Sequence, residues 1–482
     1  MDNTVARQTE NPLGSKSIGS LLLNFSVPAV ISCLVNSVYN IVDQIFIGQG
    51  VGYLGNAATT VAFPIMTIIM AFATLIGSGG SAYAAIRLGQ KKEEDAQRSL
   101  NNVFTLSILL GLCAAVLGLL FLTPILRLFG ATDTVLPYAK DYTSIILLGV
   151  PFNIIGVSLS TMARTDGHPR LSMYGILIGA VLNTILDPIY IFVFKWGVRG
   201  GAIATVTAQI LSAAILSWYF WKKGNMRFCV SKMKLSAHTC KKIFTLGMSA
   251  GITQLVACIM QVVMNNSLVY YGNQSEVGGD AALSAMGIVM KIAMILAAVG
   301  IGIGIGAQPI IGYNYGAQKH HRIRKTYLIG ITAATIVIVL GEVICQVAPH
   351  MILKLFGGGD AQFTSFAVKC LRIYLFGVFC AGFQIISTNY FQATSQPVKA
   401  SVLSMLRQLL LLIPLLLILP LFFGLDGILF AGPAADIGSA LIVLGFVLPE
   451  MRKLNRQIRE DQKNKELVFS SAAPLHDQAI RM

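Results

Sequence analysis

The sequence contains few charged residues for its length. Asp, Glu, Lys and Arg make up 12% of the 482 residues, whereas soluble globular proteins carry roughly 25%. Hydrophobic residues make up 55% of the chain, and its mean hydropathy is +0.70. This composition excludes a soluble globular domain and predicts an integral membrane protein with many spanning segments.

Several motifs that would point to an enzyme are also absent. The chain has no GxxxxGK motif followed by Ser or Thr, so it carries no ATP motor of that kind. HExxH and GxSxG are missing as well. The eight cysteines form no CxxC pair, which favours small buried side chains over a disulfide framework or a metal site. The first twenty residues are polar, and the apolar segment that follows is too long for a signal peptide, so we expect a retained helix.

Twelve apolar segments are long enough to cross a membrane, which takes about 20 residues. They cover approximately residues 21–47, 55–86, 100–125, 138–163, 171–196, 200–221, 241–271, 280–313, 325–348, 365–393, 399–422 and 427–449. Prolines inside several of them, such as Pro28, Pro151 and Pro309, predict bends that neighbouring helices can accommodate. We therefore predict an all-α integral membrane fold with twelve transmembrane helices.

The net charge of +15 is unevenly distributed between the two sides of these segments. Most lysines and arginines fall on one side, in the loops 87–98, 164–170, 222–242 and 319–325 and in the tail 452–481. Because positive loops stay on the cytoplasmic side, both termini are predicted to be cytoplasmic in a multi-pass cell-membrane protein. The orientation of the chain in the membrane accounts for its excess of lysine and arginine, so no nucleic-acid partner is expected.

The second half of the chain repeats the first at a shift of 227 or 228 residues. Leu88–Lys92 matches Tyr315–Lys319, Leu128–Asp133 matches Leu355–Asp360, and Gly197–Gly200 matches Gly424–Gly427. Six spans per half give both halves the same orientation, so two lobes should be related by a pseudo-twofold axis along the membrane normal, around a V-shaped central cleft. The predicted N-terminal lobe covers 1–221 and the C-terminal lobe 241–449. Residues 222–240 form a cytoplasmic linker that we expect to flex, and 450–482 form a tail.

Asp187 lies in the middle of an apolar run that extends from about Ser172 to Trp196. A carboxylate at membrane depth is costly, so it is expected to face the protein interior and to serve a function. Asn183 lies one turn earlier on the same helix face, and Pro188 leaves the carbonyl of Thr184 without its helical donor. The three oxygens predict a site for a proton or a hard cation.

A second intramembrane carboxylate, Asp43, ends a polar stripe in the first span. The stripe occupies one helical face and consists of Ser32, Asn36, Asn40 and Asp43. The seventh span has a similar stripe without a carboxylate: Gln254, Cys258, Gln261 and Asn265. The eleventh span likewise has no acidic counterpart of Asp187, so ion chemistry is predicted only in the first half.

Two nearby carboxylates repel each other if both are ionised, so one takes a proton or a cation lies between them. Sodium prefers oxygen ligands. Asp43, Asn183 and Asp187 supply them and are the predicted metal ligands. Thr205 and Asn153 are further cation-coupling candidates, although both side chains are also of the kind that joins helices by hydrogen bonds.

Other polar residues in the spans leave more than one interpretation open. Lys291 is either a counter-charge in the central cleft or a snorkelling side chain. Glu342 and Arg407 are either buried partners or lipid-interface residues, and the role of Asp436 is undecided. The predicted substrate cleft is lined by Asn36, Gln261, Asn265 and Lys291.

The motifs around the two carboxylates resemble those of a known family. Asp43 is followed five residues later by Gly48, the pair Asn183 and Asp187 matches a fifth-helix motif, and Thr205 falls where a sixth-helix threonine is expected. With twelve spans and a long central link, the chain is similar to the MATE (multidrug and toxic compound extrusion) family, in particular to its MepA-like bacterial branch.

This resemblance implies a monomeric secondary antiporter that expels cationic amphipathic drugs and dyes in exchange for Na+ or H+. It implies no cofactor beyond the coupling ion, and a cation site at Asp43, Asn183 and Asp187. An alternative is a lipid-linked saccharide flippase of the same superfamily, which would need cationic residues in the cleft. Lys291 and Arg407 are the available candidates. A membrane enzyme is a third alternative, but no reactive constellation supports it.

Overall fold

The computed structural model describes residues 12–479 except 52, 130, 132 and 356–360, and this part of the chain is almost entirely helical. The helices of the first half are α1 (Pro12–Ser15), α2 (Ile18–Val51), α3 (Tyr53–Gly89), α4 (Glu93–Leu120), α5 (Leu122–Leu128), α6 (Leu136–Thr165), α7 (Pro169–Pro188), the π-helix η1 (Ile189–Val193) and α8 (Gly197–Lys222). A 3₁₀ turn, η2 (Val230–Lys232), lies in the connection to the second half. The helices that follow are α9 (Ala237–Gly272), α10 (Gly279–Gly316), α11 (His320–Val347), α12 (Pro349–Leu355), α13 (Ala361–Tyr374), α14 (Phe379–Ala393), α15 (Pro397–Met405), the π-helix η3 (Leu406–Leu412), α16 (Ile413–Phe423) and α17 (Leu425–Ala479).

The prediction of twelve spans is confirmed when one bent span is counted. Among the described residues, eleven helices are long and apolar enough to cross a membrane. The pair α13 and α14 passes the same test together and is bent by 46° at the break between them. Such apolar segments become helices because lipid offers the backbone no hydrogen-bond partner, so each segment must satisfy its own N–H and C=O groups.

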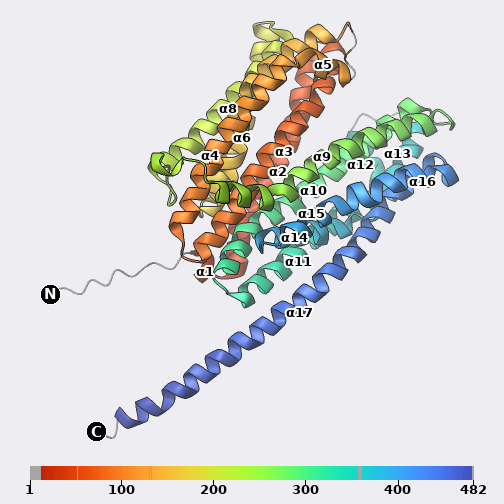
Figure 1. The fold of residues 1–482 in the computed structure, drawn as a ribbon. Coiled ribbons are helices and arrows are strands. Elements are labelled where there is room, and N and C mark those ends of the chain that lie inside the picture. The colour runs from red at the N-terminus through yellow and green to blue at the C-terminus, as the bar shows by residue number, and fades with distance from the viewer. Residues whose placement is uncertain (1–11, 52, 130, 132, 356–360, 480–482) are drawn as a thin grey trace.

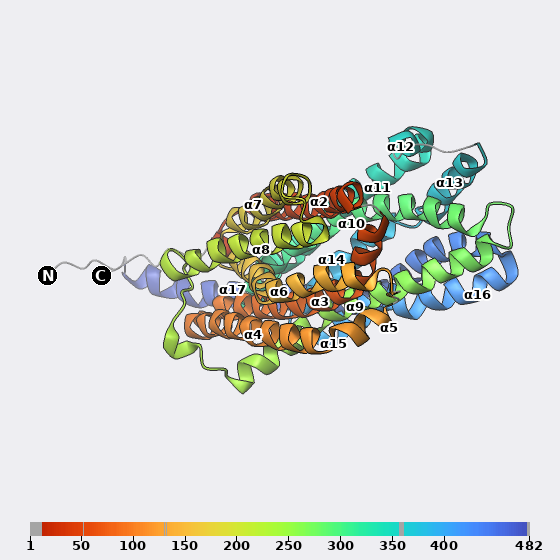
Figure 2. The same cartoon turned by 90° about the horizontal axis from the view of Figure 1, so that it is seen from above.

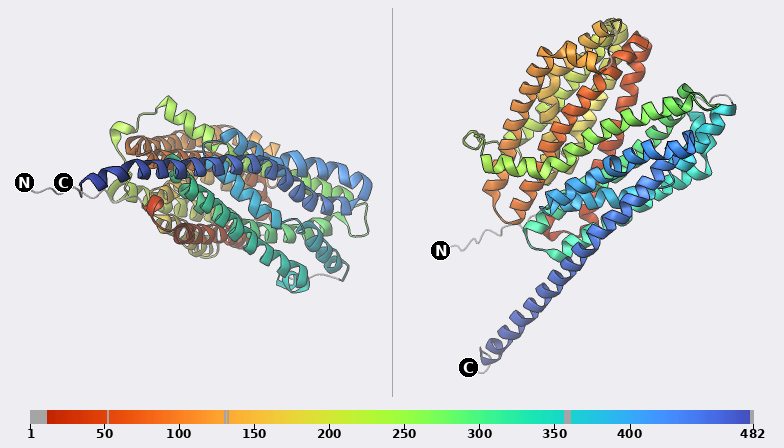
Figure 3. Two further views of the ribbon diagram at one scale, coloured as in Figure 1. Left: turned by 90° about the horizontal axis from the view of Figure 1, so that it is seen from below. Right: turned by 45° about the vertical axis from the view of Figure 1, so that its right-hand side comes forward.

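The spans form two lobes, the first made of α2–α8 and the second of α9–α17. Figure 1 shows the two groups of ribbons meeting near α1 and diverging toward the end that carries α5 and α16. Both described chain ends lie at the meeting end, which we call the terminal face (Figure 3). Between the lobes, α3 packs against α9, and α10 packs against α2 and α3.

The backbone carries the same repeat as the sequence. Residues with positive φ recur 227 or 228 positions apart, as Lys91 (59°) and Gln318 (57°), Gly167 (90°) and Ser395 (59°), and Gly197 (56°) and Gly424 (57°). Each pair marks corresponding ends of helices in the two lobes. The first and third pairs lie within the sequence repeats that begin at Leu88 and at Gly197, whereas residues 356–360 of the remaining repeat lie outside the described residues.

Glycines allow the two lobes to approach closely on the side of the terminal face. A Cβ atom at Gly247 of α9 would overlap the carbonyl oxygen of Leu75 on α3, and one at Gly316 of α10 would overlap the carbonyl oxygen of Ile86. The α3 helix therefore contacts α9 and α10 backbone to backbone. Only glycine leaves room for this packing between membrane helices.

The connection between the lobes is held against the first lobe. Asn101 of α4 accepts a hydrogen bond from the backbone N–H of Cys229 (2.9 Å), and Asn102 accepts one from the N–H of Ser236 (2.9 Å). Both asparagines are fully buried. Asp166 accepts hydrogen bonds from the backbone N–H groups of the linker residues Asn225 (3.0 Å) and Met226 (2.8 Å). The connection that the sequence predicts to flex is thus docked on the first lobe in this conformation.

One feature near the terminal face differs from the sequence expectations. Arg164 was grouped with the loop charges, but its side chain is buried in the first lobe, where it donates to the hydroxyls of Ser160 and Ser172. The tail that follows the last span, for which the sequence predicted no particular structure, continues α17 as one helix to Ala479.

Candidate functional site

The candidate cation site lies in the first lobe, where α2, α7 and α8 pack together (Figure 2). Asp187 and Asn183 come from the end of α7, and Thr205 comes from α8. All three side chains are buried, with exposed fractions of 0%, 1% and 3%. The α7 helix ends at Pro188 and continues as the π-helix η1, so the backbone changes geometry directly after the carboxylate, as π-bulges often do at functional sites.

Asn183 connects the other two residues by hydrogen bonds. In the amide orientation that satisfies every group, its NH2 donates to Asp187 Oδ2 at 2.8 Å. Its oxygen then accepts from the hydroxyl (3.2 Å) and the backbone N–H (3.1 Å) of Thr205. The amide oxygen is therefore committed to Thr205, and Asn183 fixes the position of the carboxylate. This differs from the expected role of that oxygen as a free cation ligand.

Asp43 of α2 faces Asp187 across the helix interface. The two carboxyl groups lie close enough for one, when protonated, to donate a hydrogen bond to the other. The Oδ1 atom of Asp43 is buried and has no hydrogen-bond partner in the described part of the chain. A buried acceptor without a donor is costly. A proton shared between the carboxyls, or a cation bound between them, would relieve this cost.

Two tyrosines that the sequence did not single out border the carboxyl pair. Tyr39 of α2 lies close to the hydroxyl of Thr205, and Tyr142 of α6 is buried within electrostatic range of both carboxyls. The position of Tyr39, one turn before Asp43, was a usable signal. No comparable signal marked Tyr142, because its place beside the carboxyls depends on how α6 packs within the first lobe.

The remaining predicted site residues are less closely connected with the carboxyl pair. Asn153 is half-buried on α6, and the hydrogen bonds that hold Asn183 in place do not involve it. Gln261 donates to Asn265 on the same helix (2.9 Å). Asn36 and Lys291 are exposed, and the side chain of Asn40 lies outside the described residues.

The second lobe contains an ion pair that the sequence left undecided. Half-buried Arg407 of η3 pairs with Asp436 of α17, whose side chain is 2% exposed. Gln384 of α14 donates to the backbone oxygen of Asp436 (2.9 Å). Arg407 is thus the partner of a buried carboxylate. Glu342 of α11 is also buried.

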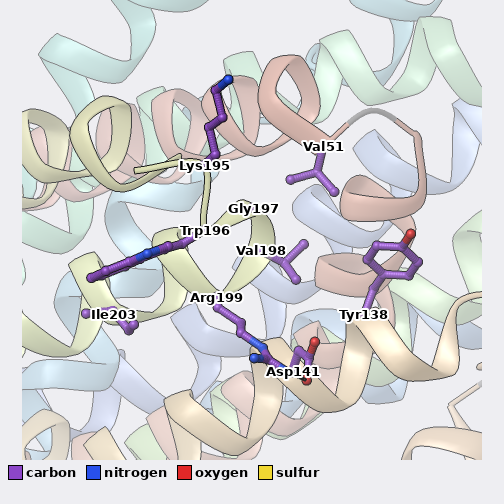
Figure 4. Close-up of a pocket in the computed structure, with 9 residues that line it drawn as sticks. All are labelled: Val51, Tyr138, Asp141, Lys195, Trp196, Gly197, Val198, Arg199 and Ile203. Atoms are coloured by element: carbon purple, nitrogen blue, oxygen red, sulfur yellow. Dashed lines mark hydrogen bonds and ion pairs between the residues drawn. The ribbon is translucent and has the colours of Figure 1, made fainter. Parts of the chain in front are cut away.

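A separate surface cavity of about 570 Å³ opens at the end of the first lobe opposite the terminal face (Figure 4). Tyr138, Trp196 and the ion pair of Arg199 and Asp141 (2.9 Å) line part of it. Neither Asp43 nor Asp187 borders this cavity. Across the described residues, no cluster of three His, Cys, Asp or Glu side chains has the geometry of a metal centre. The candidate site is thus a pair of carboxyls with amide and hydroxyl neighbours, a donor set that suits a proton or sodium.

Comparisons with known proteins find a family model, relatives and solved structures that match this chain. A family model, MatE, matches residues 28–189 and 244–418. The multidrug export protein MepA of Staphylococcus haemolyticus (strain JCSC1435) is 29% identical over 441 residues, which cover 90% of this chain and 94% of that protein. A crystal structure of MATE in complex with MaL6 superimposes with a TM-score of 0.86 at 21% identity, over 93% of this chain and 99% of the other.

A second solved structure shares the fold. It is described as the outward-facing conformation of a multidrug resistance MATE family transporter, with a TM-score of 0.85 and 21% identity over 92% of this chain and 99% of the other. The fold is that of a multi-pass membrane transporter built from two helical lobes. The chain belongs to the MatE family, whose members are transporters rather than enzymes.

Proposed function

We propose that the protein is a secondary multidrug efflux antiporter that exports cationic amphipathic compounds in exchange for Na+ or H+. The observation that carries this proposal is the buried pair of Asp43 and Asp187, which leaves one carboxylate oxygen without a donor. The MepA relative is named as a multidrug export protein, which supports drugs and dyes as the substrate class.

In the proposed mechanism, the coupling ion relieves the repulsion between the two carboxylates. Asn183 and Thr205 hold Asp187 in position, and Asn153 of α6 is a further candidate ligand. Ion binding drives transport only through a difference in affinity between the two conformations of the lobes. Because α2 packs against both α7 and the second lobe, a shift at Asp43 reaches the interface between the lobes.

The substrate is proposed to bind between the lobes, with Asn36, Gln261, Asn265 and Lys291 among the residues that line its path. The polytopic chain lies in the cell membrane as a monomer with the terminal face in the cytoplasm. This orientation follows from the basic residues of the loops at that face.

A flippase for lipid-linked saccharides is less well supported by the charges in the spans. It would require cations to hold a pyrophosphate group. Of the two candidates, Arg407 is committed to the ion pair with Asp436. Lys291 alone is a weak basis for binding a pyrophosphate.

Dye efflux in proteoliposomes tests the proposal, with sodium and pH gradients imposed independently. We expect at least one of the two gradients to drive efflux, and Asp187→Asn to abolish the driven component. Asp141→Asn is a matched control, because Asp141 is a carboxylate of the same lobe in an exposed ion pair. Gradient-driven efflux that persists in Asp187→Asn would contradict the proposed site, and transport of lipid-linked saccharide without dye efflux would favour the flippase.

A further inference from the structure

The described part of the chain begins with a short helix that is bound to the second lobe. This helix, α1, leads directly into α2 of the first lobe, yet it packs against α10 at the terminal face (Figure 1). Leu13 of α1 is 1% exposed and joins the hydrophobic core that contains Ile310 and Ile323 of the second lobe. Residues 12–16 therefore connect the two lobes.

The carbonyl oxygens of α1 are held by cationic side chains of the second lobe. Arg322 of α11 donates from Nη2 to the carbonyls of Leu13 (3.2 Å) and Lys16 (2.6 Å). Lys319, in the turn between α10 and α11, donates from Nζ to the carbonyl of Gly14 (2.9 Å). The last carbonyls of a helix have no partner within the helix, and cations near them are stabilising. The α10–α11 turn thus caps α1.

The second lobe differs at this turn from its repeat partner in the first lobe. Asn314 of α10 accepts a hydrogen bond from Nε of Arg322 (3.0 Å) and donates one to the carbonyl of Leu13 (3.1 Å). The positions 227 residues earlier are occupied by Arg87 and Asp95, which form an ion pair with each other (3.6 Å). The second lobe therefore has a guanidinium where the first lobe has a carboxylate, and that guanidinium binds α1.

Helix α1 lies beside the point where the ends of the two lobes touch. A Cβ atom at Gly14 would lie 2.8 Å from Cε1 of Tyr313, and one at Gly89, the last residue of α3, would overlap the carbonyl oxygen of Tyr313. Tyr313 of α10 thus contacts both α1 and the end of α3. Because α2 packs against α7 as well as α10, separation of the lobes here requires either α1 to leave the second lobe or α2 to leave the first.

We propose that α1 is a strap that holds the terminal face closed and that detaches from the α10–α11 turn when this face opens. The inference rests on the proposed exchange between two conformations of the lobes, in which α2 keeps Asp43 beside Asp187 and so moves with the first lobe. Detachment breaks the hydrogen bonds from Arg322 and Lys319 and exposes Leu13. The strap therefore stabilises the conformation described here relative to one that is open at the terminal face.

Spin labels on the full chain in lipid nanodiscs test the proposal by two readings. The labels are attached through non-natural amino acids, because the eight native cysteines stay in place. A label at exposed Lys16 reports the mobility of α1. A pair of labels at Glu93 of α4 and His321 of α11, both exposed, reports the distance between the lobes at the terminal face.

Arg322→Gln should make the label at Lys16 mobile and add a population with a longer distance between Glu93 and His321. We expect the ratio of closed to open molecules to fall at least about tenfold, which is the effect of losing one hydrogen bond from a charged group. Arg324→Gln is the matched control, because Arg324 is an exposed arginine of the same helix. It should leave both readings as they are in the parent protein.

Gly14→Ala keeps the proposal falsifiable if Arg322→Gln folds poorly. It displaces α1 without changing a charge, because the added Cβ would meet Tyr313, and Gly19→Ala is its control, because a Cβ there meets no atom within 4 Å. A label at Lys16 that stays immobile in both strap variants would overturn the proposal. So would a mobile label with an unchanged distance across the terminal face. Neither reading involves a coupling ion or a dye, so the expected spin-label results together with failed efflux would contradict the antiporter and support the strap.

Discussion

At the scale of single residues, the two carboxyls of the first lobe differ in their hydrogen-bond partners. Asp187 has a donor in Asn183, whereas Asp43 Oδ1 has none. The asymmetry makes Asp187 the fixed member of the pair and Asp43 the member that gains most from a bound proton or cation. Thr205 contributes through Asn183, because its hydroxyl and backbone N–H hold the amide oxygen.

Replacing Thr205 by valine removes the hydroxyl and keeps the shape of the side chain. One neutral hydrogen bond contributes about 1 kcal/mol, so we expect an apparent affinity for the coupling ion about fivefold weaker. Thr207→Val is the matched control, because Thr207 lies on the same helix and bonds only to the backbone of Ile203 (2.7 Å). The dependence of dye efflux on ion concentration gives the apparent ion affinity of both variants. Equal losses of affinity in Thr205→Val and Thr207→Val would contradict the positioning role of Thr205.

His168 gives the protein a stability component that depends on pH. It lies in the loop between α6 and α7, where a hydrogen bond with Asp166 raises its pKa above the usual 6.5. A raised folded-state pKa contributes stability that is fully present below the unfolded pKa and is lost as pH rises through the folded pKa. We therefore expect the thermal stability advantage of the parent protein over His168→Gln to be larger near pH 6 than near pH 8. A difference in melting temperature that does not change with pH would contradict this expectation.

At the scale of elements, the inter-lobe connection is docked on α4 of the first lobe. Asn102 donates to the carbonyls of Lys232 (3.3 Å) and Lys234 (3.4 Å) and accepts from Ser236. The connection is therefore bound to the first lobe up to Ser236, and we expect a change of angle between the lobes to occur at the start of α9.

Asn102→Ala should release this segment from α4. Loss of a buried side chain that satisfies backbone groups costs about 1–3 kcal/mol. Hydrogen exchange should therefore become faster at the amides of residues 229–236 and remain unchanged in α6 and α7. Arg98→Ala changes an exposed residue of the same helix and is the control. Equal protection of residues 229–236 in both variants would show that the docking does not depend on Asn102.

At the scale of the whole molecule, the lobes meet at the terminal face and diverge at the opposite end (Figure 1). The meeting end is held by close helix packing and by a hydrogen bond between the lobes, from Gln392 of α14 to Ser78 Oγ of α3 (2.9 Å). The proposed antiporter mechanism requires these contacts to break, so their strength would set the balance between its two conformations.

Gly247→Ala should shift that balance away from the conformation described here. The added Cβ would overlap the backbone of Leu75, and overpacking costs about 1–3 kcal/mol, enough to change the ratio of two conformations roughly 5- to 150-fold. Distances between spin labels on α5 and α16 should become shorter as the divergent ends close. Gly445→Ala is the control, because a Cβ there meets no atom within 4 Å, and an equal response in both variants would exclude the contact as a determinant.

The sequence by itself determined the class of fold and the chemistry available to it. Apolar length sets the number of spans, since lipid requires each segment to satisfy its own backbone. The repeat sets the equivalence of the halves, and it reappears in the paired positive-φ residues, such as Lys91 and Gln318. The spacing of Asn183 and Asp187 on one helix was sufficient to predict that they would meet.

Only the tertiary structure decided which helices bring which polar groups together. The spans are apolar on the sides that face lipid and on the sides that face protein, so periodicity does not reveal how each helix is rotated. For this reason Tyr142, the burial of Arg164 and the pairing of Arg407 with Asp436 had no reliable signal in the sequence.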